Sequence, residues 1–300
     1  MLLTLTLTTL GCSPATTDTS APPPVPPPGG TGWAALSHDG YAACALDGDG
    51  SVHCWGNDDA RVVTDAPAGT GFRAISVDQA ACALDAEGAL TCWGTNLSGN
   101  LTDLPSGSFV AVSLGGGLGC AVDAGGHPVC WGASAWTLAD RLALVVTALD
   151  VEASLVCGLD ATGALACDGT FGDGDDNFTP LEGSYSEVSA GGSRGCALDH
   201  EGRATCFNDR WSSDDYEIPG TGLHGLVSGR AFSCALDAHH LVVCAGPRSA
   251  QEVTPGIPDR PLARLVAGGD VVCGLDDVGA ITCWGESTSN ITDGPAADGG

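Results

Sequence analysis

Fourteen of the fifteen cysteines form seven pairs, and the two members of every pair are ten residues apart. The pairs are Cys44/Cys54, Cys82/Cys92, Cys120/Cys130, Cys157/Cys167, Cys196/Cys206, Cys234/Cys244 and Cys273/Cys283. Successive pairs begin 37 to 39 residues apart. A unit of this length that recurs seven times indicates a repeat architecture, in which each unit buries its apolar face against its neighbours. The chain is therefore expected to form one array rather than one or two ordinary domains.

Each cysteine pair frames the same short text, which predicts a β-hairpin. In the second repeat, Leu84, Asp85 and Gly88 follow the first cysteine by two, three and six residues. Apolar residues at alternate positions have the period of a strand. If the paired cysteines face each other, the three-residue loop between the strands ends at the glycine, where a left-handed backbone is required. His240 replaces this glycine in the sixth repeat, and histidine tolerates that conformation better than most residues.

We expect each cysteine pair to form a disulfide that joins the two strands of its hairpin. On the chain-entropy model, closing so short a loop contributes about 2–3 kcal/mol per bridge. The alternative is metal binding, but zinc sites use closely spaced cysteines or histidine partners, and neither recurs here. The sequence therefore predicts seven disulfides, no metal ligands and no cofactor.

The aspartate three residues after the first cysteine recurs in every repeat: Asp47, Asp85, Asp123, Asp160, Asp199, Asp237 and Asp276. These side chains are either ligands or catalytic acids, or they accept hydrogen bonds from the backbone of their own turns. We expect the second role, because aspartate commonly fills it in turns. The acidic loop at Asp173–Asn177 lacks the glycine and glutamate of a calcium loop at the required spacing, so it is expected to be solvated.

Two further segments of each unit read as strands. One carries the apolar residues Leu36, Ile75, Val112, Leu149, Val188, Leu226 and Leu265; the other is a β-branched piece that ends near a proline, as at Val63–Pro67 and Leu101–Pro105. No such piece precedes Trp33, and the missing copy follows the last hairpin at Ile291–Pro295. The pattern predicts an all-β, seven-bladed propeller with about four short antiparallel strands per blade, closed by a strand near 291–293.

The hairpins followed by Cys-Trp-Gly resemble the RCC1 repeat (regulator of chromosome condensation) in a bacterial, secreted, cysteine-paired form. The tryptophans that carry the resemblance are Trp55, Trp93, Trp131 and Trp284. The resemblance spans roughly Trp33 to Pro295 and implies a seven-bladed propeller, in agreement with the repeat count. Activities in that family are varied, and a shared fold transfers none of them. We expect the tryptophans to pack between blades; the alternative is a stacking platform for a ligand.

The N-terminus resembles a bacterial lipoprotein signal. An apolar stretch, Met1–Leu10, is followed by Gly11 and Cys12, and then by a proline-rich spacer. The alternative is an apolar N-terminus with an incidental cysteine. The expected organisation is a signal peptide at 1–11, a lipidated Cys12 with its linker at 12–31, the propeller at 32–296 and a disordered tail at 297–300. This organisation predicts an exported, lipid-anchored protein of the bacterial outer membrane, cell surface or periplasm.

The charge excludes one class of partner. The chain has 37 acidic and 10 basic side chains, which give a formal charge of -27. Nucleic-acid binding requires basic groups that displace phosphate counterions, so it is excluded. The sequence predicts a monomeric, non-enzymatic scaffold that recognises a protein or surface glycan and meets the membrane only through its lipid anchor.

Two other function classes remain as alternatives. A secreted hydrolase or lyase would need a concave pocket with paired carboxylates of shifted pKa. A nucleotide-exchange regulator rests on family analogy alone and would need a cytosolic GTPase.

Overall fold

A computed structural model describes residues 32–96, 99–132, 145–152, 155–169, 181–192, 194–208, 216–246 and 253–286, together with Ile291. The expectations for the signal peptide, Cys12, the linker, the loop at 173–177 and the tail at 297–300 all lie outside these residues. The described chain contains 21 strands in seven antiparallel sheets of three strands each. None of its helices is long and apolar enough to cross a membrane.

Each sheet is one blade, built from an inner, a middle and an outer strand in chain order. The inner strands are β1 (Ala35–His38), β4 (Phe72–Val77), β7 (Phe109–Gly115), β10 (Val146–Glu152), β13 (Tyr185–Gly191), β16 (His224–Ser228) and β19 (Arg264–Gly268). The middle strands are β2 (Ala42–Leu46), β5 (Ala80–Asp85), β8 (Leu118–Asp123), β11 (Leu155–Asp160), β14 (Arg194–Asp199), β17 (Ser233–Leu236) and β20 (Val271–Leu275). The outer strands are β3 (Val52–Gly56), β6 (Leu90–Gly94), β9 (Pro128–Gly132), β12 (Leu165–Gly169), β15 (Ala204–Asn208), β18 (Val242–Ala245) and β21 (Ile281–Gly285).

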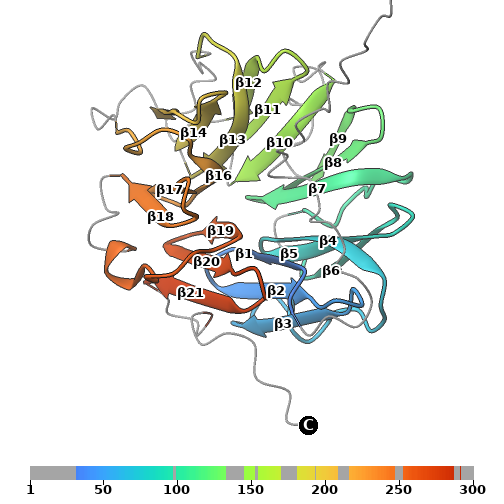
Figure 1. Ribbon diagram of the computed structural model, residues 1–300. Coiled ribbons are helices and arrows are strands. Elements are labelled where there is room, and N and C mark those ends of the chain that lie inside the picture. Colours follow the sequence, from blue (N-terminus) through green and yellow to red (C-terminus); the bar gives the residue numbers. More distant parts are fainter. Residues whose placement is uncertain are drawn as a thin grey trace, which may run out of the picture.

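The blades form a closed ring, and the chain is a seven-bladed β-propeller, as the repeat count predicts. Each inner strand contacts the next one along the chain, and β19 contacts β1 (Figure 1). The core is divided among the contacts between blades. For example, Ala42 and Cys44 of the first blade share one cluster with Ala81 and Trp93 of the second. Middle strands are buried on both faces, which explains their small and apolar sequences.

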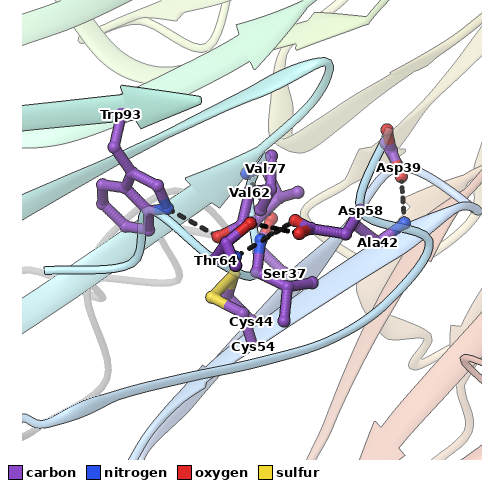
Figure 2. The surroundings of a disulfide bond; sticks show 11 residues. Ser37, Asp39, Ala42, Cys44, Cys54, Asp58, Val62, Thr64, Val77 and Trp93 are labelled. Atoms are coloured by element: carbon purple, nitrogen blue, oxygen red, sulfur yellow. Dashed lines mark hydrogen bonds between the residues drawn. A yellow bond between two sulfur atoms is a disulfide. The ribbon is translucent and has the colours of Figure 1, made fainter. Parts of the chain in front are cut away.

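The hairpins confirm the predicted disulfides. Each bond joins two cysteines that lie in register across a middle and an outer strand. The seven bonds join Cys44 to Cys54, Cys82 to Cys92, Cys120 to Cys130, Cys157 to Cys167, Cys196 to Cys206, Cys234 to Cys244 and Cys273 to Cys283. Figure 2 shows the first of them.

The two cysteines of each bond differ in burial. The first cysteine, in the middle strand, is fully buried in every blade. The second, in the outer strand, is only partly buried in every blade: Cys54, Cys92, Cys130, Cys167, Cys206, Cys244 and Cys283. Each bond therefore ties the outer edge of a blade to its buried centre. Because all fourteen sulfurs are used in disulfides, these cysteines are structural and supply no thiolate to a metal ion.

The turns of the hairpins have the predicted chemistry. In the first turn, Asp47 Oδ1 accepts hydrogen bonds from the backbone N of Asp49 and Ser51 at 3.0 and 2.9 Å. Gly50 has a φ of 76°, and His240 adopts 61° at the equivalent position. The repeated aspartate is therefore a turn residue, as expected.

The structure has three strands per blade, so the prediction of about four is wrong for the described residues. The fourth segment of the second blade is a turn that lies under a tryptophan. Trp93 Nε1 donates to the carbonyl of Val62 at 2.8 Å, and Val62 is fully buried (Figure 2). The carboxylate of Asp58 accepts hydrogen bonds from the backbone N of Val63 and Thr64. These bonds curl the segment, because side-chain acceptors compete with a strand ladder for backbone donors.

The first blade receives its equivalent segment from the far end of the chain. Trp55 Nε1 donates to the carbonyl of Ile291 at 3.0 Å, across 236 residues. Ile291 is fully buried and packs with Leu36, Ala43 and Val271. Of the segment predicted to close the ring near 291–293, only Ile291 is among the described residues. Its contacts join the C-terminal segment to the first blade.

Candidate ligand site in the central channel

A cavity of about 340 Å³ lies on the axis of the ring and is lined by residues from all seven inner strands. A concave cavity with a few convergent polar groups is the usual form of a ligand site. The lining mixes alanine, leucine and valine with serines, three carboxylates, two histidines and one arginine. The site is therefore built from the inner strand of each repeat.

A belt of polar side chains in this lining holds neighbouring blades together. Its members occupy the inner-strand position opposite the first cysteine in the first five blades: Ser37, Ser76, Ser113, Asp150 and Ser189. Four of them accept a hydrogen bond from a backbone N of the next blade, donated by Val77, Leu114, Val151 and Ala190 at 2.9–3.1 Å. Figure 2 includes the bond between Ser37 and Val77. These polar side chains therefore have a structural role, because their hydrogen bonds hold neighbouring blades together.

Asp150 replaces serine in this belt and is saturated with donors. It accepts hydrogen bonds from the hydroxyls of Ser113 and Ser189 at 3.4 and 3.1 Å, and from the backbone N of Val151 and Ala190 at 3.0 and 2.9 Å. Burial raises the pKa of Asp150, and these bonds oppose the rise. With four donors engaged, Asp150 joins three blades and has a structural role.

Three other carboxylates gather where the inner strands end, and we call this end of the channel the carboxylate mouth: Asp39, Asp78 and Glu152. Each lies three residues after the apolar residue of its inner strand, Leu36, Ile75 or Leu149. The inner strands all run in the same direction around the axis, so their last residues meet at one end of the ring. At this position the other four blades have Gly115, Gly191, Gly229 and Gly268.

Those glycines are required because neighbouring backbones approach closely at this end. A Cβ on Gly115 would lie 2.6 Å from the Cα of Glu152, and one on Gly268 would lie 2.4 Å from the carbonyl oxygen of His38. Such contacts leave no room for a side chain. At this strand-end position only three blades therefore carry a side chain, and in all three it is an acid.

The three acids differ in how many hydrogen bonds the protein donates to their carboxylates. Asp39 Oδ1 accepts hydrogen bonds from the backbone N of Tyr41 and Ala42, both at 2.8 Å; Figure 2 includes the bond from Ala42. Asp78 Oδ2 accepts one from the backbone N of Gly117 at 3.3 Å. Glu152 accepts none from the part of the chain that the structure describes. Glu152 is therefore the carboxylate with the most unused acceptor capacity.

Burial and repulsion between the acids raise the pKa values of Glu152 and Asp39. The pKa of Glu152 is raised to about 8, first by burial and then by the charges of Asp150, Asp78 and Asp39, while the charge of Arg230 opposes the rise. Burial likewise raises the pKa of Asp39 to about 6, against the hydrogen bonds from Ala42 and Tyr41. Arg230 also pairs with Asp270 at 3.4 Å. The mouth is thus short of positive charge.

These shifts predict that the protein loses stability as the pH rises. A carboxyl with a raised folded-state pKa holds a proton that the unfolded chain releases, so its stabilising effect is complete below about pH 4.5 and is lost as the pH passes through about 8. Glu152→Gln removes the effect of charging this residue. We expect the variant to melt more than about 3 °C above the wild type at pH 9 and within about 1 °C of it at pH 4.

Thermal unfolding of both proteins across this pH range is the measurement. Glu87→Gln, a change at an exposed acid in the turn between β5 and β6, is the control and should follow the wild type throughout. Equal melting temperatures of Glu152→Gln and wild type at pH 9 would contradict the prediction.

At the opposite end of the channel the carboxylate is Glu187, and it is hydrogen-bonded to the protein backbone. Glu187 lies at an inner-strand position where the first four blades have alanine, and its Oε2 accepts a hydrogen bond from the backbone N of Leu226 at 2.9 Å. The register of β16 shifts between His224 and Val227, which frees that donor from the ladder. Glu187 therefore satisfies an irregular strand of the next blade.

The tryptophans proposed as an alternative ligand platform are buried. Trp55, Trp93, Trp131 and Trp284 are 3–9% exposed, and the first three donate their indole N–H to a backbone carbonyl. Trp284 packs with Val253. The stacking-platform alternative is therefore wrong: these rings are packing residues, as the main expectation held. Among the described residues, no group of three or more His, Cys, Asp or Glu side chains is placed to hold a metal ion.

The carboxylate mouth was missed in the sequence, although a signal was present. Counting from the first cysteine misaligns the three acids, because that cysteine follows the apolar inner-strand residue by seven residues in the second blade and by eight in the first and fourth. Counting from the apolar residue of the inner strand aligns them with each other and with the four glycines.

Comparison with known proteins shows the fold. No family model and no curated protein matches the chain. Among solved structures, the ectodomain of the Physcomitrella patens receptor kinase CR4 matches with a TM-score of 0.68 at 24% identity, over 84% of this chain and 73% of that one. The CRINKLY WD40 ectodomain of the Arabidopsis thaliana receptor kinase ACR4 matches with a TM-score of 0.69 at 21% identity, over 85% and 95%.

A third similar structure is Prp20p from Saccharomyces cerevisiae, the yeast RCC1, which was studied for its binding to Gsp1p and histones. It matches with a TM-score of 0.61 at 14% identity, over 79% of this chain and 80% of that one. The chain therefore has an RCC1-like propeller fold. Seven disulfides persist only in an oxidising environment, so the protein is an exported one.

Proposed function

We propose that this protein is a non-enzymatic, surface-anchored scaffold that recognises a protein or glycan partner at the carboxylate mouth of its channel. The observation that carries the proposal is that Glu152 lines a cavity walled by all seven blades and lies near enough to Asp39 and Asp78, from two other blades, to feel their charges. A rigid ring with acceptors at its mouth suits recognition, and its charge of -27 favours a basic partner and excludes nucleic acid.

Lipidation of Cys12 would tether the ring to a bacterial envelope through the proline-rich linker at 12–31. Such a linker is extended and semi-rigid, so it would hold the propeller away from the membrane surface. The ring would act as a monomer, because its closure packs every inner strand against the blades on both of its sides.

Two arms of one experiment test the proposal. In the first, wild type should sediment with membranes and Cys12→Ala should be released in soluble form. In the second, a partner crosslinked in intact envelopes should be retained by the wild type and lost from a triple variant, Asp39→Asn, Asp78→Asn and Glu152→Gln. The control is Asp49→Asn, Glu87→Gln and Asp277→Asn, at exposed acids in the hairpin turns of the opposite face. Equal capture by the two triple variants would reject the mouth as the binding site.

A secreted hydrolase is the second candidate, because a buried carboxyl with a pKa of about 8 can act as a general acid at neutral pH. Acid–base catalysis also needs a partner group whose pKa is shifted the other way. The pKa of Asp39 is raised as well, so binding is favoured. Hydrolysis of envelope glycans by the wild type but not by Glu152→Gln would establish the hydrolase instead. Nucleotide exchange is supported by likeness of fold alone.

A further inference from the structure

The carboxylate mouth offers hydrogen-bond acceptors that the protein does not use. Glu152 lines the cavity and accepts no hydrogen bond from a described residue. His38 lines the same cavity and is only 4% exposed. Its Nε2 faces the carbonyl oxygen of Val266 at 3.4 Å, and its Nδ1 has no partner among the described residues. A ring nitrogen that faces a carbonyl must donate, so Nδ1 is an acceptor. Buried polar groups are normally satisfied, and an orphaned acceptor at a cavity wall therefore points to a ligand.

Positive charge at this end of the channel is too scarce to balance the acids. The groups that face Glu152 are Asp150 on its own strand, Asp39 and Asp78 in the turns after β1 and β4, and Arg230 in the turn after β16. Arg230 already pairs with Asp270. Acceptors and negative charge in one cavity match a ligand that supplies both donors and positive charge.

We propose that the carboxylate mouth binds an organic cation, the ammonium group of an alkylamine, which Glu152 receives as a hydrogen-bonded ion pair. The inference rests on the proposed function and names the chemistry that the mouth recognises. One water takes roughly 30 Å³. The cavity of about 340 Å³ has room for many waters, and it is therefore large enough for a chain the size of a lysine side chain. A metal ion fits less well, because no three described ligand side chains converge on one point.

The ammonium group can come from a free amine or from a lysine of a protein partner, and two probes separate these sources. Full-length chain carrying Cys12→Ala is titrated calorimetrically, at low salt, with 1,5-diaminopentane and with N-acetyl-lysine methylamide. Pentan-1-ol is the uncharged control, and magnesium chloride tests for simple cation attraction. Binding by the diamine alone assigns a free amine, and binding by the capped lysine assigns a partner's side chain. Both outcomes support the proposal.

Glu152→Gln should weaken amine binding at least tenfold, because it removes a charge-assisted hydrogen bond. Glu87→Gln should leave the affinity unchanged. Wild-type affinity should also be higher at pH 8.5 than at pH 6, since the cation competes with the proton on Glu152. Folding of each variant is checked by its melting temperature.

The proposal is overturned if neither amine binds, if magnesium binds more tightly than either amine, or if Glu152→Gln and Glu87→Gln bind equally. In that case this inference fails. The proposed function is still supported if partner capture in the crosslinking experiment depends on the three acids of the mouth.

Discussion

Complete reduction of the seven disulfides is expected to unfold the ring at a temperature where the oxidised protein remains fully folded. Each bridge closes a ten-residue loop and contributes about 2–3 kcal/mol on the chain-entropy model. Seven bridges together contribute on the order of 15–20 kcal/mol, which is more than the roughly 5–15 kcal/mol that stabilises a typical domain. Every first cysteine of a pair is also fully buried, so reduction and alkylation there force open the contacts between blades.

The measurement is circular dichroism of protein reduced in denaturant, alkylated and returned to buffer, compared with protein taken through the same steps without reductant. We expect the alkylated chain to lose its sheet signal and its cooperative melting transition. A single-bridge variant, Cys82→Ser with Cys92→Ser, should keep the fold and melt several degrees lower, since one bridge is a small share of the total. A reduced, alkylated chain that melts like the oxidised protein would show that the packing between blades is sufficient by itself.

The second large effect is expected at the closure of the ring. Ile291→Ala should cost about 2–5 kcal/mol, the usual range for truncating a fully buried isoleucine. Ending the chain after residue 290 should cost more, because it also removes the carbonyl that accepts the Trp55 indole N–H. A buried donor left without a partner costs about 1–3 kcal/mol in addition.

Chemical denaturation of these two proteins and the wild type measures the losses. Val278→Ala is the matched control, since Val278 is 72% exposed and its truncation should change stability by less than about 0.5 kcal/mol. If the protein ending at residue 290 unfolds at the wild-type denaturant concentration, closure does not depend on Ile291.

The hairpins could be predicted because every determinant of a hairpin lies within about ten residues. Cys82 and Cys92 face each other, Asp85 accepts a hydrogen bond from its own turn, and Gly88 adopts a φ of 84°. The strand count was wrong for a similarly local reason that the sequence pattern did not reveal. β-branched residues at Val62–Thr64 favour a strand, but the carboxylate of Asp58 captures their backbone donors and Trp93 covers them.

The sequence by itself determined seven hairpins, their disulfides and the need for closure by a C-terminal segment, because local turn chemistry and a strict period specify these features. Only the tertiary structure decided that Asp39, Asp78 and Glu152 form one mouth and that Ser37 and its equivalents form a belt between blades. These acids lie on three different blades, and the unequal spacing between the inner strand and the first cysteine shifts them out of the cysteine register. Ring closure brings the ends of parallel inner strands together, and burial at that end then raises the pKa of Glu152.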